Sequence, residues 1–291
     1  MILCPRCGGE LSADQLSCAA CGAVRTVEGV VDFTLEADAG TGDYNPAWFE
    51  QLDRVEACYF WFRARRAVIL DMFRRHVPRS SRVIEIGTGT GNVAAALAAD
   101  GYNVAVSDVH LEALRYAGSK GLSERYRFDI MRPPFHEHFD VIGLFDVLEH
   151  IDDDTSALAG IRAMLRSNGL IILTVPAHQR LWNQSDVTAL HKRRYGVAEL
   201  RRKVEAAGFK VLESRGFFIS LLPLLALRAL VSPARAATRS GQSEELTVVP
   251  VANAVLNAML TIERRLLGCW RAPLGGSIAL VARKTTDTAP N

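Results

Sequence analysis

The sequence predicts an α/β fold in which a mainly parallel sheet carries helices on both faces. Short apolar runs that suit buried strands alternate with helix-like segments between residues 82 and 176. The first apolar run, residues 83–86, leads directly into a glycine-rich turn and then into an alanine-rich helix. Strands and helices that alternate in this way form parallel sheets, and ligands bind at the carboxyl ends of the strands.

The composition is that of a folded globular protein. The 291 residues are 49% hydrophobic and 23% charged, and 34 Lys and Arg against 32 Asp and Glu leave a net charge of +2. These values exclude a disordered chain, a collagen-like chain and a broadly basic nucleic-acid wrapper. The first three residues run directly into Cys4 without the basic and apolar segments of a signal peptide, so we expect a cytoplasmic location.

Four cysteines near the amino terminus have the spacing of a zinc site. They form two C-x2-C pairs separated by ten residues, and a glycine follows each pair: Cys4, Cys7, Cys18 and Cys21. Four thiolates close a tetrahedron around Zn²⁺ and leave no open position, so the predicted ion is structural. The alternatives are two disulfides, which a reducing cytosol disfavours, and thiols without metal.

The chain divides into five expected segments. They are a zinc-ribbon module over residues 1–35 that ends in a short hairpin (24–35), a linker (36–47), a core (48–216), an apolar helical insertion (217–272), and a last strand with a tail (273–291).

The core opens with a helical pattern from residue 48 to residue 76, which Pro78 ends. Four consecutive aromatic residues, at positions 59–62, lie inside this pattern. One face of a helix cannot hold all four rings. They therefore pack between helices or form a wall over a ligand cleft.

The remaining elements follow in order. We expect strands at 83–86, 103–107, 140–145, 170–175, 210–216 and 277–284, a further strand ending at 128–129, and helices at 93–100, 110–118, 152–166 and 198–207.

The glycine-rich turn does not match a phosphate-binding loop. Asn92 stands where the third glycine of a dinucleotide fingerprint belongs, and no Gly-Lys-Ser/Thr follows. Glu85 lies just before the turn, where a carboxylate would repel phosphate and favour a cationic ligand.

Over residues 60–215 the sequence resembles the class I S-adenosylmethionine-dependent methyltransferases of the type-11/12 kind. The segment from Glu85 to Gly91 is similar to the first motif of that family, and Asp108 is similar to its ribose-binding acid. The segment from Phe145 to His150 resembles the fourth motif of ubiquinone-type and related enzymes. The resemblance implies a Rossmann-like sheet of seven strands whose last strand is antiparallel.

The same resemblance implies S-adenosylmethionine as cofactor, bound by a set of loop and strand-end residues. These are Glu85, Gly87, Thr88, Gly89, Gly91, Asp108, Val109, Asp129, Ile130 and Phe145. Three of them have simpler interpretations: Asp108 as the N-cap of a helix, Asp129 as a turn residue, and Glu85 as an acid paired with an arginine.

Three candidates for catalysis follow the fourth and fifth strands: His150, His191 and Tyr195. A histidine titrates near neutrality and suits removal of a proton from an oxygen acceptor. With Arg194, His191 and Tyr195 also suit an anionic acceptor. The alternatives are that His150 caps or packs a helix, and that Tyr195 packs beneath the helix at 198–207.

The predicted function is O-methylation of a small secondary-metabolite, sugar or lipid-linked acceptor. The apolar insertion fits a lid over an apolar acceptor, a homodimer surface, a peripheral membrane contact or plain core packing. A ribosomal-RNA guanine methyltransferase is the alternative, and a non-catalytic cofactor-binding adaptor is the second. The small net charge argues against an RNA groove, and nothing in the sequence indicates a DNA partner.

Overall fold

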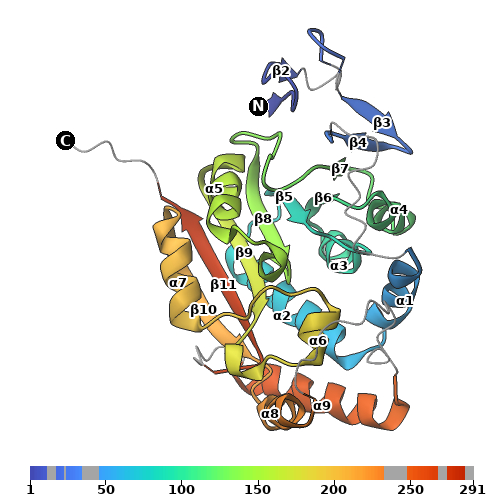
Figure 1. The fold of residues 1–291 in the computed structure, drawn as a ribbon, viewed down its shortest axis with the longest axis vertical. Helices are drawn as coiled ribbons and strands as arrows, with labels where there is room; N and C mark the ends of the chain where they lie inside the picture. The colour runs from blue at the N-terminus through green and yellow to red at the C-terminus, as the bar shows by residue number, and fades with distance from the viewer. Residues whose placement is uncertain (12–17, 23, 35–45, 233–247, 268–273, 286–291) are drawn as a thin grey trace, which may run out of the picture.

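A computed structural model describes residues 1–11, 18–22, 24–34, 46–232, 248–267 and 274–285 (Figure 1). Most of the predicted linker at 36–47, the middle and the end of the insertion at 217–272, and the last six residues of the tail lie outside these ranges.

A nine-stranded sheet forms the centre of the molecule, in the order β10-β11-β9-β8-β5-β6-β7-β4-β3. Strands β4 to β9 pair in parallel, whereas β11 lies antiparallel between β9 and β10, as the sequence predicts. The strands are β3 (Arg25–Val27), β4 (Val30–Asp32), β5 (Arg82–Ile86), β6 (Asn103–Asp108), β7 (Arg125–Arg127), β8 (Phe139–Phe145), β9 (Leu165–Pro176), β10 (Phe209–Phe217) and β11 (Ser277–Lys284).

Two of these strands lie outside the predicted seven. The hairpin predicted within 24–35 forms as β3 and β4, and β4 pairs in parallel with β7. The N-terminal segment therefore extends the sheet of the core. At the opposite edge, the pairing of β10 with β11 shifts register between Val211 and Glu213.

Helices cover both faces of the sheet. Apolar side chains of α5 (Asp154–Met164) and α7 (Val197–Ala206) pack on one face. Those of α2 (Phe60–His76), α3 (Asn92–Ala99), α4 (Leu111–Ser119) and α9 (Pro250–Leu267) pack on the other. The short helices are α6 (Gln184–Thr188), η1 (Leu148–His150) and η2 (Gln179–Leu181).

The sequence predicts one helix over residues 48–76, and this prediction is wrong in one respect, because the chain forms two helices there. Helix α1 (Pro46–Glu56) ends before Tyr59, and α2 begins at Phe60. Asn253 of α9 stabilises the break. Its side chain accepts a hydrogen bond from the Phe60 amide at 2.7 Å and donates one to the Cys58 carbonyl at 3.0 Å. A residue almost 200 positions away thus satisfies the free backbone groups of the turn.

The insertion between the last two strands contains α8 (Leu222–Val231) and α9, as predicted. These helices lie at the end of the molecule opposite the N-terminal strands (Figure 1). Several of their apolar side chains are exposed: Leu224, Leu227, Leu230, Val231, Val251, Val255, Ile262 and Leu266. In the described ranges, no helix combines the length and the apolar character needed to cross a membrane.

Acid should destabilise the fold through His138. Its ring stacks on Phe135 with the centroids 5.1 Å apart, and burial, followed by the charge of Arg82, lowers the pKa of His138 to about 4. The pKa of an unfolded histidine is about 6.5, so the unfolded chain binds more protons between these values.

Stability should therefore fall as pH drops from about 6.5 towards 4. Urea unfolding at pH 7 and pH 5 tests this. The midpoint of wild type should fall more than that of His138→Phe, which keeps an aromatic ring but does not titrate. If the urea midpoint falls equally in the two proteins between pH 7 and pH 5, His138 does not cause the acid sensitivity.

Candidate functional site

The glycine-rich turn joins β5 to α3 at the carboxyl edge of the sheet. Three of its glycines are left-handed: Gly87 has φ +70°, Gly89 +54° and Gly91 +78°. A side chain at Gly89 would have open space, since its nearest neighbour is Leu52 of α1 at 3.9 Å. At Gly89 the turn thus presents bare backbone with open space beside α1, which suits a ligand that approaches the main chain closely.

Gly87 also fixes how closely two loops approach each other. A Cβ atom there would lie 2.6 Å from Cγ2 of Val147, in the loop that follows β8. Gly87→Ala should destabilise the protein by about 2–4 kcal/mol, through left-handed strain plus overpacking.

Gly101→Ala is the matched control, because Gly101 has φ +90° but no neighbour within 4 Å. It should cost only the backbone strain of about 1–2 kcal/mol. Urea unfolding measures both, and adding Val147→Ala should restore part of the loss at Gly87. If the two single variants lose equal stability, the contact with Val147 contributes nothing.

Asp108 ends β6 beside the glycine-rich turn. Its carboxylate accepts hydrogen bonds from the amide of Gly89 at 3.0 Å and from the amide of His110 at 2.9 Å. Burial raises the pKa of Asp108, against these two backbone hydrogen bonds. The residue that caps α4 is His110, so the N-cap interpretation of Asp108 is wrong. The carboxylate instead joins the end of β6 to the turn.

Buried polar atoms without partners surround this turn. Among the described residues, Oε2 of Glu85, Oγ1 of Thr88 and Oγ of Ser107 are buried and have no hydrogen-bond partner. Glu85 is 3% exposed, and its burial raises its pKa to about 8, while the charge of Arg65 opposes the rise. Such atoms fit a polar ligand that supplies the missing donors and acceptors, as the hydroxyl and amino groups of S-adenosylmethionine would.

The other predicted cofactor residues have different surroundings. Asp129 is exposed and accepts a hydrogen bond from the Met131 amide at 2.9 Å, which is the geometry of a turn residue. Ile130 is buried beside it. Phe145 ends β8, but its ring packs into the core near Phe73, so only its backbone lies at the edge of the sheet.

A pocket of about 420 Å³ is bordered by α1, α2, α6, α8 and α9, and its lining includes Leu52, the nearest neighbour of a side chain at Gly89. One wall is aromatic and aliphatic, with the side chains of Trp48, Tyr59, Phe60, Trp61, Phe62, Leu221, Leu224, Leu225 and Leu256. All four members of the aromatic run line it, in agreement with the interpretation as a wall over a cleft.

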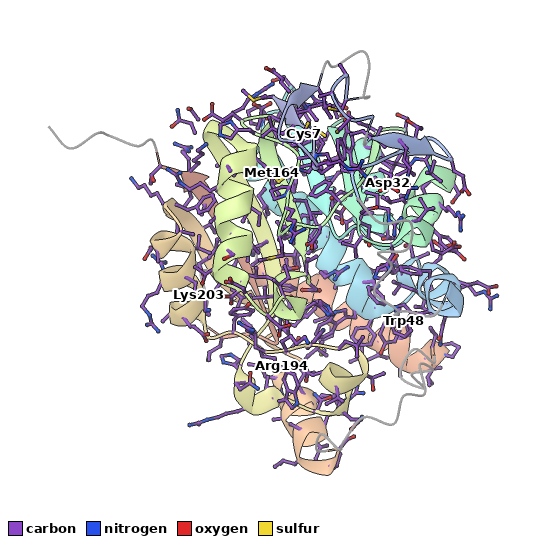
Figure 2. The ribbon with its side chains drawn as sticks, turned by 45° about the horizontal axis from the view of Figure 1, so that its top comes forward. Cys7, Asp32, Trp48, Met164, Arg194 and Lys203 are labelled. Atoms are coloured by element: carbon purple, nitrogen blue, oxygen red, sulfur yellow. The ribbon has the colours of Figure 1, made fainter. Side chains whose placement is uncertain are left out.

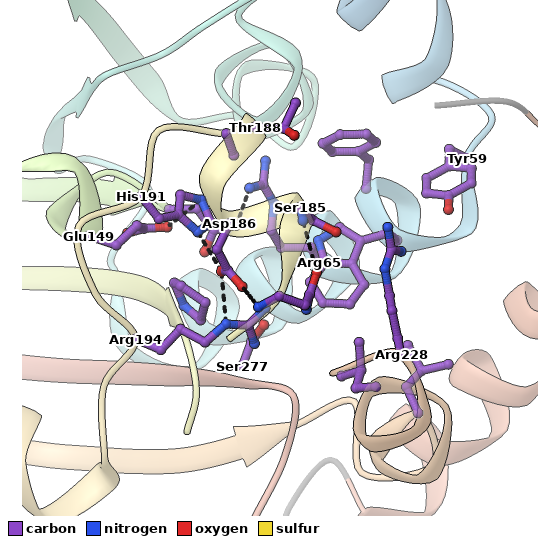
Figure 3. Close-up of a pocket in the computed structure, with 18 of the residues that line it drawn as sticks. Tyr59, Arg65, Glu149, Ser185, Asp186, Thr188, His191, Arg194, Arg228 and Ser277 are labelled. Carbon is purple, nitrogen blue, oxygen red and sulfur yellow. Dashed lines mark hydrogen bonds and ion pairs between the residues drawn. The ribbon is translucent and has the colours of Figure 1, made fainter. Parts of the chain in front are cut away.

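The other end of the pocket is polar (Figure 3). Nδ1 of His191 lies 2.8 Å from Oδ1 of Asp186, and Nε2 of His191 lies 4.0 Å from Oε1 of Glu149. The ring of His150 stands edge-on to that of His191, with centroids 4.8 Å apart. Two of the three predicted catalytic residues therefore meet in one pocket.

Burial controls the pKa values of two residues at this end, and hydrogen bonds control that of a third. It raises the pKa of Glu149, 0% exposed, well above the usual range, and the charge of Asp146 adds to the rise. Burial, together with the charge of His191, lowers the pKa of His150 to about 4. For Asp186, hydrogen bonds from His191 and Arg194 outweigh burial and lower the pKa. At neutral pH His150 is therefore uncharged, and Asp186 is ionised.

Tyr195 does not reach the pocket. It is 0% exposed, and its hydroxyl donates hydrogen bonds to Asp154 at 2.9 Å and to the Leu148 carbonyl at 3.3 Å. The prediction of a catalytic Tyr195 is wrong, since its side chain packs inside the fold. Arg194 lines the pocket, but its Nε already binds Asp186 at 2.8 Å.

Sequence analysis missed the contribution of α1 and α2. Glu56 of α1 accepts a hydrogen bond from the Thr90 hydroxyl in the glycine-rich turn, and Arg65 of α2 pairs with Asp146. No sequence motif marks these contacts, because each joins residues that are far apart in the chain.

The four N-terminal sulfurs converge as a metal site requires. They lie within 4.8 Å of one another, with separations of 3.4 Å (Cys4 to Cys21), 3.5 Å (Cys7 to Cys18) and 3.8 Å (Cys7 to Cys21). A tetrahedron with Zn–S bonds of about 2.3 Å has edges of about 3.8 Å. A hydrogen bond with Cys7 lowers the pKa of Cys18 to about 6, which favours the thiolate that binds metal.

Comparison with known proteins agrees with this geometry. Residues 60–214, more than half of the chain, match the profile of a family described as "Methyltransferase domain". The chain belongs to this methyltransferase family.

Relatives of known name are distant. A ubiquinone biosynthesis O-methyltransferase from Aeromonas salmonicida (strain A449) is 26% identical in an alignment of 155 positions, which covers 46% of this chain and 65% of the relative. The methyltransferase chain thus spans less than two thirds of the length of the curated relatives it matches first.

Solved structures share the fold. A methyltransferase from Haloferax volcanii, in a complex with the Trm112 methyltransferase activator, has a TM-score of 0.56 at 15% identity, covering 84% of this chain and 97% of its own. Phosphoethanolamine N-methyltransferase 2 of Haemonchus contortus, with bound S-adenosyl-L-methionine, has a TM-score of 0.54 at 14% identity, covering 84% and 59%. At these identities the likeness concerns the fold alone, which is that of class I methyltransferases.

Proposed function

We propose that the protein transfers a methyl group from S-adenosylmethionine to an oxygen atom of a small molecule. The observation that carries the proposal is the Asp186–His191 pair at the polar end of the pocket, with Nδ1 and Oδ1 2.8 Å apart. The ubiquinone-type names of the distant relatives point to the same kind of acceptor.

The cofactor would lie along the glycine-rich turn. Asp108 would accept the hydrogen bonds of the ribose hydroxyls, and the unpartnered atoms of Glu85 and Thr88 would face the amino-acid part. The bound sulfonium supplies an activated methyl group together with its own leaving group. The protein therefore contributes mainly by holding the acceptor in line with it.

His191 would remove the proton of the acceptor hydroxyl. Asp186 accepts the hydrogen bond of Nδ1 and so leaves Nε2 free to take a proton on the side of Glu149. The pKa of His150, lowered to about 4 by burial, makes it a weak base, so we assign it to orienting the acceptor. The four cysteines would hold one structural Zn²⁺.

The acceptor should have an apolar or aromatic body and one hydroxyl group. The aromatic and leucine wall accommodates the body, and the polar end accommodates the hydroxyl. A pocket of about 420 Å³ with an apolar wall suits a small molecule better than an RNA strand, which needs a basic groove.

The test is release of S-adenosylhomocysteine from S-adenosylmethionine, measured with a panel of phenols, catechols, sugars and polyprenyl-linked phenols, and separately with total RNA. Turnover with a hydroxylated small molecule and none with RNA supports the proposal. Turnover with RNA alone would replace it with the RNA-modifying alternative, and binding of cofactor without turnover would favour the adaptor.

A further inference from the structure

The N-terminal residues contact one particular loop of the core. We call the described part of residues 1–34 the N-terminal module, and residues 128–134, which follow β7, the cofactor loop. The loop contains Asp129 and Ile130, which the resemblance to class I methyltransferases implies as cofactor residues. Within the module, Cys7 of the four-cysteine cluster and Asp32 of β4 lie at the same end of the molecule (Figure 2).

The module holds the start of the cofactor loop. The amide of Phe33 donates a hydrogen bond to the carbonyl of Arg127 at 2.9 Å, directly before the loop. Arg127 is buried, and its guanidinium lies 3.5 Å from the carboxylate of Asp32 on β4. Nε of Arg127 also donates to the carbonyl of Val109, the residue after Asp108, at 2.9 Å. One arginine thus connects the module with the backbone beside the proposed ribose site.

The module also holds the end of the loop. The amide of Leu3 donates a hydrogen bond to the carbonyl of Pro134 at 2.7 Å, and the amide of His136 donates to the carbonyl of Met1 at 3.0 Å. The buried ring of Phe135 packs edge-to-face on Phe33 with centroids 5.6 Å apart. Both ends of the loop are therefore bonded to the same module.

A metal bound by the four cysteines would order the segment around β1, which holds the end of the loop. Leu3 directly precedes Cys4, and the turn that follows is closed by two backbone hydrogen bonds between Cys4 and Gly8 or Gly9. Strands β1 (Ile2–Leu3) and β2 (Glu10–Leu11) have two residues each, too few to hold the turn alone. In segments this small, the free energy of metal binding is the free energy of folding.

We propose that the four-cysteine metal site positions the cofactor loop, so that metal binding and S-adenosyl cofactor binding are thermodynamically linked. The inference rests on the proposed function only for the identity of the cofactor. Because such coupling is reciprocal, bound cofactor should also slow the loss of the metal.

The sharpest test is Leu3→Pro, which removes the amide that bonds Pro134 and keeps all four cysteines. Zinc content should stay at one ion per chain. If the loop is ordered in only one molecule in ten of the variant, the apparent dissociation constant for S-adenosylhomocysteine should rise about ten-fold, because only the ordered fraction binds. Calorimetry measures this constant. Amide exchange in residues 128–134 should accelerate. With saturating S-adenosylmethionine kcat should be that of wild type, because the defect lies in binding.

Cys18→Ser tests the metal itself, and Cys58→Ser is its control, since Cys58 lies outside the cluster. Cys18→Ser should lose zinc and weaken S-adenosylhomocysteine binding at least as much as Leu3→Pro, whereas Cys58→Ser should bind like wild type. Folded Leu3→Pro and Cys18→Ser proteins that both bind with the wild-type constant would overturn the inference. If wild type binds no S-adenosylhomocysteine, the proposed function fails, and exchange rates of the loop with and without zinc still decide the inference.

Discussion

Replacing His191 with Ala should lower kcat by about 10²–10⁴-fold, the usual contribution of a general base, while the affinity for S-adenosylhomocysteine stays unchanged. The loss is confined to the chemical step because His191 lies at the polar end of the acceptor pocket and not at the glycine-rich turn. Single-turnover rates and calorimetry on the same protein separate the two effects.

Two further variants sharpen this test. Asp186→Asn keeps the size of the partner but removes its charge, and it should lower kcat by about ten-fold or more, since the histidine loses its orienting carboxylate. His136→Ala, an exposed histidine far from the pocket, should turn over like wild type. A His191→Ala enzyme with undiminished kcat would leave alignment of the acceptor as the whole mechanism.

Replacing Asp108 with Ala should raise the dissociation constant for S-adenosylhomocysteine by about 10²-fold or more. Two hydrogen bonds from ribose hydroxyls to a carboxylate contribute about 1.5–3 kcal/mol each, and every 1.4 kcal/mol is a factor of about ten. The variant also loses the hydrogen bond to the Gly89 amide, which loosens the turn.

Asp152→Ala is the control for this variant, because Asp152 is an exposed acid that pairs with Lys192 at 3.5 Å. Its dissociation constant should equal that of wild type. Unfolding without ligand should show that Asp108→Ala remains folded at the temperature of the titration. If it is folded and binds with the wild-type constant, Asp108 does not recognise the ribose.

The alternation of strands and helices was predictable from the sequence because local patterns determine it. The strand at 83–86, the glycine-rich turn and the acid at position 108 belong to consecutive elements of the chain, and parallel pairing brings them to one edge of the sheet. The same holds for the four cysteines, whose spacing alone predicts their convergence.

Contacts between distant residues were not predictable in this way. Asn253 stabilises the break between α1 and α2 at Cys58, although it lies almost 200 positions away in the chain. The parallel pairing of β4 with β7 joins residues about 95 positions apart. The catalytic role predicted for Tyr195 failed for the same reason. Its hydroxyl is taken by Asp154, a partner 41 positions earlier in the chain.

The two edges of the nine-stranded sheet bear on whether this protein stays dispersed at high concentration. An open edge strand can recruit an edge of another molecule and start aggregation. At one edge β3 offers only three residues, of which Arg25 and Thr26 are exposed. At the other, β10 is longer, but its pairing with β11 shifts register between Val211 and Glu213, and it carries the charged side chains of Glu213 and Arg215. Both edges are therefore poorly suited to pairing with an edge strand of a second molecule.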